Sequence, residues 1–219
     1  MFVVGQNDFE LNFSDQVLQQ GGPQEVGPYS SRHKILVVGD GDLTFSLSLA
    51  SALGGNKIVA TTFDSFFTLR KKYKGVQATI GALEAVGATV LHDVDATLMD
   101  SQLEPGKFHR VVFNFPHIGG ATEADVELNQ ELLRKFFANA RPRLNASGEC
   151  HVALRKTLFY DSWDVVSQAE HSGMKLIRVE KFKGDYLSYE NQRTSGEGQV
   201  RQAPSIANAR RYVFALDRS

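Results

Sequence analysis

The chain has 219 residues, a net charge of −1 and a single cysteine, Cys150. This length suits one substantial domain and excludes two large ones. A near-neutral nucleic-acid-binding protein would need its cations gathered on one face. The lone cysteine excludes an intramolecular disulfide and favours a reducing compartment. No apolar run reaches the length of a transmembrane helix, and one cysteine with scattered histidines gives no support for a metal site.

Residues 1–31 differ in composition from the rest of the chain. Glycine, proline and serine interrupt a polar segment that has no sustained hydrophobic period. We therefore predict a partly disordered N-terminal extension over residues 1–31, followed by one domain over residues 32–219. Within the extension, Phe9, Leu11 and Phe13 alternate with polar residues, as in a short edge strand.

The stretch from residue 35 to residue 46 organises the remainder. Residues 35–38 are apolar and mostly β-branched, which predicts a buried strand. Gly39 and Gly41 permit a sharp turn, and Asp42 can cap the helix that follows. Such a strand–turn–helix unit directs free backbone N–H groups and the helix dipole at a nucleotide-like ligand. Thr44 stands where a dinucleotide-binding fingerprint has its third glycine, which disfavours nicotinamide and flavin.

A second strand is predicted over residues 57–63, and Asp64 follows it directly. This acid lies about 20 residues beyond the glycine turn, where nucleotide-binding domains hold a ribose hydroxyl. Its alternative role is to cap the next helix. The densest basic cluster, Arg70–Lys74, comes next. It is either a solvated helix face or a contact for RNA phosphates.

The later elements alternate. Strands are predicted over residues 88–91, 108–113, 149–154, 174–182 and 212–216, and helices over residues 76–86, from 122 onwards and around 163–169. Thr122 to Asp125 has the pattern of a capping box. Because parallel strands need crossovers, we predict a Rossmann-like, doubly wound α/β fold with a seven-stranded sheet, mostly parallel with the last strand antiparallel. Residues 183–209 form a long polar loop.

Four stretches carry a family resemblance. They are Gly39-Asp40-Gly41-Asp42-Leu43-Thr44-Phe45-Ser46, Ala60-Thr61-Thr62-Phe63-Asp64-Ser65, Val94-Asp95-Ala96-Thr97 and Val112-Phe113-Asn114-Phe115-Pro116-His117. With their spacing, they resemble the Rossmann-like large-subunit rRNA uridine-N3 methyltransferases, within the class I S-adenosylmethionine-dependent methyltransferases, over about residues 33–216. The family's tyrosine-proline-glycine-tyrosine is here Tyr186-Leu187-Ser188-Tyr189, which keeps both tyrosines and changes the turn between them.

The resemblance implies S-adenosylmethionine as cofactor. The glycine turn would line its methionine part, Asp64 would hold the ribose, and Asp95 with Ala96 would face the adenine. The implied cofactor-binding residues are Gly39, Asp40, Gly41, Leu43, Thr44, Phe45, Ser46, Asp64, Asp95, Ala96 and Asn114. All of them fall at the carboxyl ends of predicted parallel strands, where ligands of open sheets bind.

The tetrapeptide from Asn114 to His117 is similar to the asparagine-proline-proline-aromatic motif of amino-methylating enzymes. Asn114 would align the base, and His117 would accept the proton of an imide nitrogen. The alternative for His117 is a loop histidine that binds a backbone carbonyl. Phe115 would stack on a flipped base. The implied substrate-binding residues are Phe115, Pro116, Arg155, Tyr186, Tyr189 and Arg193.

The resemblance therefore implies an S-adenosylmethionine-dependent RNA methyltransferase that modifies N3 of a uridine in large-subunit rRNA, whereas the residues by themselves predict a nucleotide-like cofactor at the strand ends with a cleft beside it. Its expected partner is ribosomal RNA or a pre-ribosomal particle. We expect a monomer with no membrane segment and no metal, which the resemblance places in the nucleus or nucleolus. Otherwise it would be cytoplasmic, and it is not expected to be secreted. One alternative is an amino-group methyltransferase acting on adenine or cytosine, and another is a non-catalytic RNA-binding or ribosome-assembly factor. A nicotinamide oxidoreductase ranks third.

Overall fold

The computed structural model describes residues 22–120, 122–182, 186, 187, 189 and 205–218. A seven-stranded sheet forms its centre, in the order β5-β4-β3-β6-β7-β9-β8. The strands are β3 (Ile35–Val38), β4 (Ile58–Thr61), β5 (Thr89–Leu91), β6 (Phe108–Asn114), β7 (Leu144–Leu154), β8 (Met174–Lys181) and β9 (Arg210–Leu216). Only β9 runs antiparallel to its neighbours within this sheet. The predicted Rossmann-like fold is thereby confirmed.

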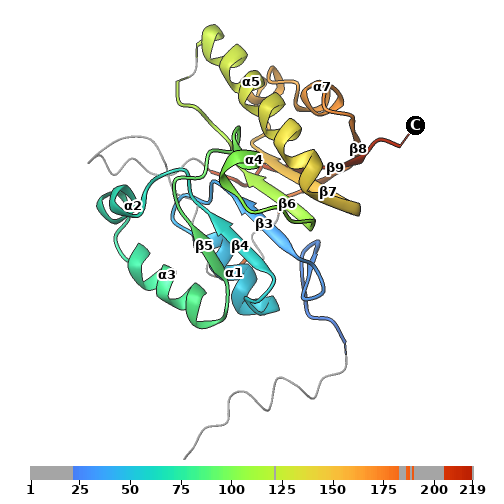
Figure 1. The fold of residues 1–219 in the computed structure, drawn as a ribbon. Coiled ribbons are helices and arrows are strands. Elements are labelled where there is room, and N and C mark those ends of the chain that lie inside the picture. The colour runs from blue at the N-terminus through green and yellow to red at the C-terminus, as the bar shows by residue number, and fades with distance from the viewer. Residues whose placement is uncertain (1–21, 121, 183–185, 188, 190–204, 219) are drawn as a thin grey trace, which may run out of the picture.

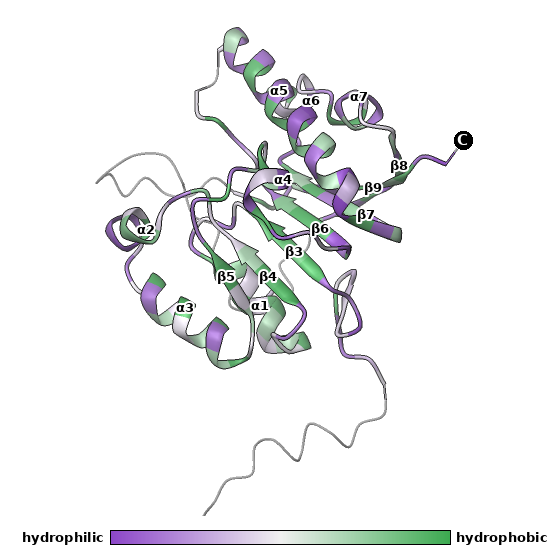
Figure 2. Ribbon diagram, viewed as in Figure 1, coloured by the Kyte–Doolittle hydropathy of each residue, from purple (hydrophilic) through white to green (hydrophobic). Residues whose placement is uncertain are grey.

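Helices cover both faces of the sheet (Figure 1). They are α1 (Thr44–Leu53), α2 (Phe66–Lys72), α3 (Val76–Ala85), α4 (Met99–Gln102), α5 (Glu123–Ala140), the 3-10 helix η2 (Arg141–Arg143), α6 (Leu158–Asp161) and α7 (Val165–Glu170). Helices α1 and α3 share one apolar core with the sheet, and α4, α5 and α7 share the other. Figure 2 shows apolar strands between helices whose outer faces are more polar.

Local sequence signals explain the ends of several elements. All four residues of β3 are buried between β4 and β6, as expected for a continuous apolar run. The capping box predicted at the start of α5 is confirmed. There the Asp125 carboxylate accepts hydrogen bonds from both the backbone N–H and the hydroxyl of Thr122, each at 2.7 Å. These contacts satisfy polar groups that the helix start would otherwise leave without partners.

A small hairpin precedes the sheet. Its strands are β1 (Glu25–Val26) and β2 (Tyr29–Ser30), and Tyr29 is completely buried. The Tyr29 hydroxyl lies 3.2 Å from Nδ1 of His151 on β7. The packed structure therefore already includes residues that the sequence assigned to an extension ending at residue 31. Residues 1–21, including the predicted edge strand around Phe9, lie outside the described residues.

Candidate active site

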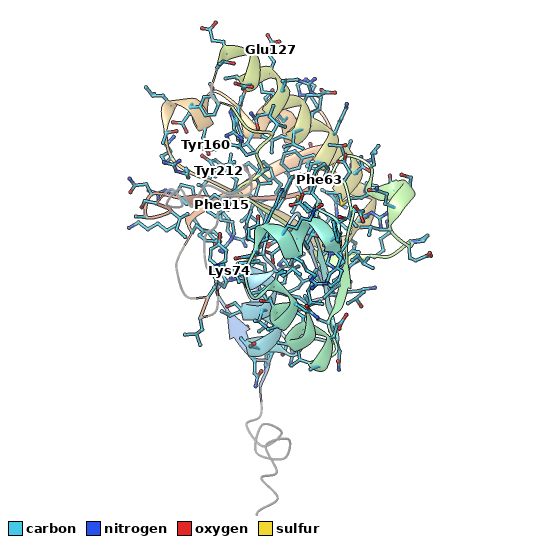
Figure 3. The ribbon with its side chains drawn as sticks, turned by 90° about the vertical axis from the view of Figure 1, so that its left-hand side faces the viewer. Phe63, Lys74, Phe115, Glu127, Tyr160 and Tyr212 are labelled. Atoms are coloured by element: carbon cyan, nitrogen blue, oxygen red, sulfur yellow. The ribbon has the colours of Figure 1, made fainter. Side chains whose placement is uncertain are left out.

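The carboxyl ends of the parallel strands meet at one edge of the sheet, as the sequence predicted. Backbone hydrogen bonds continue beyond the strands and fix the loops there. Asp40 N donates to Thr61 O at 2.9 Å, and Phe115 N donates to Ala153 O at 2.9 Å. Figure 3 labels Phe115 and Tyr160 on one side of this edge and Phe63 on the other. The polar groups that follow these strands consequently share one side of the molecule.

The glycine turn has a conformation that requires its first glycine. Gly39 has a φ of 62°, and a Cβ atom added to it would lie 2.9 Å from Cε2 of Phe113 on β6. Leu43, the residue that precedes α1, is also left-handed, with a φ of 65°. Two left-handed residues in five reverse the chain between β3 and α1 at some conformational cost. This cost is typical of functional turns, which supports a ligand site here.

Two carboxylates hold the start of α1. Asp40 accepts hydrogen bonds from the backbone N–H and the hydroxyl of Ser46, at 2.7 and 2.6 Å. Asp42 accepts from the backbone N–H and the hydroxyl of Thr44, at 3.1 and 2.7 Å. Burial raises the pKa of Asp40 to about 7, although the hydrogen bonds from Ser46 act in the opposite direction. Both acids therefore organise the turn from within, and Asp42 binds a helical N–H as predicted.

Five of the residues implied in cofactor binding are buried, and three of these directly follow the glycine turn. The three are Leu43, Phe45 and Ser46. Leu43 and Phe45 belong to the apolar core beneath α1, and the Ser46 hydroxyl is bound to Asp40. A cofactor at this turn would therefore meet their backbone rather than their side chains.

The acids that follow β4 and β5 have fixed orientations. Both oxygens of Asp64 bind Nζ of Lys72, at 2.9 and 2.8 Å. Asp64 does not cap the next helix, because the Ser65 hydroxyl performs that role for α2. Asp95 accepts from the backbone N–H and the hydroxyl of Thr97, both at 2.7 Å. The neighbouring Ala96 is almost completely buried.

Tyr73 is a site residue that the sequence did not predict. Its ring is 9% exposed, and its hydroxyl is buried without a hydrogen-bond partner among the described residues. Burial raises the pKa of this hydroxyl, and the charges of Asp42, Asp64 and Asp40 raise it further. The hydroxyl is therefore buried within the electrostatic influence of the acids of the glycine turn and of Asp64. Its sequence signal was hidden by the surrounding basic run, although Tyr73 lies four residues after the buried Leu69.

Asn114, the last residue of β6, has a buried side-chain amide without hydrogen-bond partners among the described residues. Its amide nitrogen and oxygen are both buried, and neither has a partner in the described part of the chain. Buried amides are nearly always hydrogen-bonded, because an unsatisfied one costs about 1–3 kcal/mol. One donor group and one acceptor group are thus available at the strand end. These two groups fit a bound polar ligand such as a nucleoside.

The residues after Asn114 form a strained turn supported by aromatic rings. Phe115 has a φ of 52°, and its ring packs edge-to-face against Phe182 with centroids 5.2 Å apart. His117 accepts a hydrogen bond at Nδ1 from the backbone N–H of Gly119, at 2.7 Å. Its ring lies 5.3 Å from that of Trp163. His117 thus binds the backbone of its own loop, through an N–H rather than the carbonyl of the alternative interpretation.

Arg155 and Pro116 were also predicted to bind the substrate. Arg155 directly follows β7, and its guanidinium lies 5.7 Å from the ring centre of Tyr160. Pro116 is buried and follows Asn114 by two residues. Arg193 lies outside the described residues. Tyr160, in the short helix α6, is an additional aromatic residue at this rim that the sequence analysis did not include.

The two tyrosines of the late loop are not equivalent. Tyr186 is 4% exposed, its hydroxyl binds the guanidinium of Arg211, and its ring packs against Phe45. It stabilises the core and offers no open face to a base. Tyr189 also packs against Phe45, and burial raises its pKa, with a further contribution from the charges of Asp40 and Asp42. Tyr189 therefore lies beside α1, next to Phe45.

The described residues contain no group of three or more histidine, cysteine, aspartate or glutamate side chains arranged to hold a metal ion. None of the helices in the described ranges is long and apolar enough to cross a membrane.

The strand order, with the antiparallel β9 between β7 and β8, is that of the class I S-adenosylmethionine-dependent methyltransferases. A family model described as "BMT5-like: rRNA (uridine-N3-)-methyltransferase BTM5-like" matches residues 36–193. The chain belongs to this family, which confirms the resemblance seen in the sequence, and S-adenosylmethionine is its cofactor.

Relatives and solved structures agree with this assignment. An uncharacterized Arabidopsis thaliana protein, At4g26485, is 35% identical over 196 residues, covering 85% of this chain and 94% of the relative. The 25S rRNA (uridine(2634)-N(3))-methyltransferase of Saccharomyces cerevisiae is 22% identical, with 91% of this chain and 76% of the yeast protein covered. TrmN from Thermus thermophilus aligns with a TM-score of 0.53 and 18% identity, covering 84% of this chain and 44% of that chain. This last likeness shows the fold alone.

Proposed function

We propose that this methyltransferase modifies N3 of a uridine in large-subunit ribosomal RNA. The description of its family and the activity in the name of the yeast relative support this substrate. The structural observation that carries the proposal is the buried, unpartnered amide of Asn114. A pre-ribosomal particle is the proposed partner. Such a substrate would place the protein, as a monomer, in the nucleolus.

The amide of Asn114 complements the imide edge of uridine. On that edge the N3–H donor lies between two carbonyl oxygens. The Asn114 Nδ2 can donate to one of these carbonyl oxygens and leave the direction of the N3–H bond open for the incoming methyl group. Its Oδ1 can accept from another donor of the bound ligands, which would satisfy both orphaned groups. We therefore propose that Asn114 orients N3 toward the methyl group.

Bound S-adenosylmethionine supplies an electrophilic methyl group. Attack by N3 forms a nitrogen–carbon bond as the carbon–sulfur bond breaks, and N3 gives up its proton. The proposed cofactor contacts are the backbone at Gly39 and Gly41, the Asp64 and Asp95 carboxylates and the Tyr73 hydroxyl. Because protein groups already fix these acids, they would contribute orientation with little reorganisation.

The position of His117 bears on the destination of that proton. With Nδ1 accepting from Gly119, the neutral ring carries its proton on Nε2. Acceptance of the uridine proton at Nε2 would require the other tautomer and loss of the Gly119 hydrogen bond. We therefore propose that His117 positions the loop beside the base and that solvent takes the proton.

Nucleoside analysis would test the proposal. Large-subunit rRNA from cells without the protein would be incubated with the purified protein and isotope-labelled S-adenosylmethionine, then digested and separated by mass spectrometry. We expect label in 3-methyluridine, and none with Gly41→Val, whose side chain would crowd the cofactor. Label in an amino-methylated adenosine or cytidine would favour the second enzyme class. RNA binding without any label would favour an assembly factor.

A further inference from the structure

Three phenylalanines on one short stretch are exposed. Phe63 follows β4, and Phe66 and Phe67 begin α2, with exposed fractions of 68%, 39% and 67%. Every other phenylalanine in the described ranges is buried or half-buried. Helix α2 faces the core through Leu69, and its C-terminal neighbour Tyr73 is buried beside it. Phe66 also packs against the ring of His92, with ring centroids 5.7 Å apart, so contact with the domain explains part of its position but not the exposure of Phe63 and Phe67.

Cations lie over two of these rings. The Arg70 guanidinium is 5.6 Å from the ring centre of Phe66, and Nζ of Lys71 is 4.4 Å from that of Phe67. Both pairs have the spacing of four residues that brings side chains together on a helix. Lys74 is a third exposed cation, just beyond the helix. No acid in the described part of the chain forms an ion pair with any of these three, whereas Lys72 binds Asp64.

We propose that this surface, the α2 platform (Phe63, Phe66, Phe67, Arg70, Lys71 and Lys74), binds unpaired nucleotides of the RNA substrate. Bases stack on aromatic rings, and the cations beside the rings meet the phosphates between successive bases. Exposed rings with cations beside them supply both kinds of contact that alternating bases and phosphates need. The proposal rests on the proposed function in one respect, namely that the ligand is the RNA to be methylated.

The location supports this role. Phe63 immediately precedes Asp64, so the platform begins at the sheet edge that carries the candidate active site. Figure 3 labels Phe63 and Lys74 at opposite ends of this region. Nucleotides on the platform would flank the target base, and any base can stack there because every base has a π-face. The platform therefore anchors RNA without selecting its sequence, and its loss should raise KM more than it lowers kcat.

Fluorescence anisotropy with a labelled single-stranded oligouridylate tests the proposal in the full-length protein. Phe67→Ala and Phe67→Leu should each weaken binding roughly 5- to 100-fold, whereas Phe67→Trp should keep wild-type affinity. Lys71→Gln should reduce the slope of log affinity against log salt by about 0.7 for one lost phosphate contact. Leu128→Ala on α5, which also removes an exposed apolar side chain, is the matched control and should bind normally.

Three results would overturn the platform. One is wild-type affinity in Phe67→Ala, and another is wild-type affinity in Phe67→Leu, which would show a non-aromatic contact. The third is equal affinity of the wild type for the same RNA annealed into a duplex. The outcome is separable from the proposed function. RNA binding that depends on the α2 platform, without methyl transfer, would contradict the proposed enzymatic function and support the platform. Methyl transfer with unaltered RNA binding by Phe67→Ala would support the proposed function and contradict the platform.

Discussion

His117 accepts a hydrogen bond at Nδ1 from the backbone N–H of Gly119, 2.7 Å away. This contact joins two residues of the loop that leaves β6, and it determines which ring nitrogen carries the proton. Because Nδ1 uses its lone pair, the neutral ring is protonated at Nε2. The aromatic rings of Trp163 and Tyr160 then hold the imidazole plane. The geometry therefore gives His117 a role in loop conformation.

His117→Ala tests this role against proton acceptance. We expect single-turnover methyl transfer to slow by up to about 10²-fold, as misplacement of a reacting group does. The pH profile should keep its wild-type shape, and cofactor affinity measured by calorimetry should be unchanged. A positioned general base would instead contribute about 10²–10⁴ in rate. Loss of an inflection near the usual pKa of histidine would restore the acceptor role.

Asn114→Ala should separate activity from stability. Removal of an unpartnered buried amide costs no hydrogen bond, so the free energy of unfolding should stay equal or rise. Methyl transfer should nevertheless be lost, because nothing would orient the base. Asn129 is the matched control, since its buried amide accepts from Ile118 N and donates to Asp125 O. Asn129→Ala should destabilise the protein by about 1–3 kcal/mol in urea unfolding. Equal destabilisation by both substitutions would give Asn114 a structural role.

Tyr73→Phe should weaken S-adenosylmethionine binding without lowering stability. The hydroxyl has no hydrogen-bond partner among the described residues, so its removal would break only a contact with the cofactor. Calorimetry should show a decrease of about 0.5–1.5 kcal/mol in binding free energy, the net value of one neutral hydrogen bond. Tyr29→Phe provides the contrast, because its hydroxyl contacts His151 in the core. It should lower the unfolding midpoint and keep cofactor affinity. Wild-type affinity in Tyr73→Phe would remove the contact.

The sequence predicted what local patterns determine. The apolar run of β3, the glycine turn and the Thr122–Asp125 capping box each depend on neighbouring residues, and each lies where it was expected. The beginning of β7 was missed because the polar residues 145–147 break its hydrophobic pattern. Strand pairing with β6 nevertheless begins at Leu144, which pairs with Phe108.

The positions of two tyrosines near the candidate site depend on contacts between distant parts of the chain. Tyr186 resembles a loop tyrosine in the sequence, yet Arg211 and Phe45 bury it in the core. Tyr73 resembles part of a solvated basic run, yet its ring turns inward beside the strand ends. Local patterns cannot distinguish an aromatic residue that offers a face to a ligand from one that fills a core. The sequence therefore predicted the strand-end residues of the candidate site better than it predicted the positions of the aromatic residues around it.

Asp40 should make stability depend on pH. Burial raises its pKa from 3.8 to about 7 in the folded protein. Between these values the folded state binds more protons than the unfolded state, so the free energy of unfolding falls as pH rises. The contribution of Asp40 is complete below about pH 4 and is lost as the pH passes through about 7.

Asp40→Asn removes this titration and keeps an acceptor for the Ser46 N–H. The difference in unfolding free energy, variant minus wild type, should therefore increase with pH, by at most about 1.4 kcal/mol per unit. Urea unfolding on the two sides of this window measures it. The difference between the two proteins removes the pH dependence that other titrating groups contribute equally to both. One such group is the buried His151, whose lowered pKa makes the free energy of unfolding rise with pH instead of fall. Ser46→Ala should move the window upward, because the Ser46 hydrogen bonds lower the pKa of Asp40. Parallel curves for wild type and Asp40→Asn would mean that Asp40 stays ionised, held by its hydrogen bonds at the start of α1.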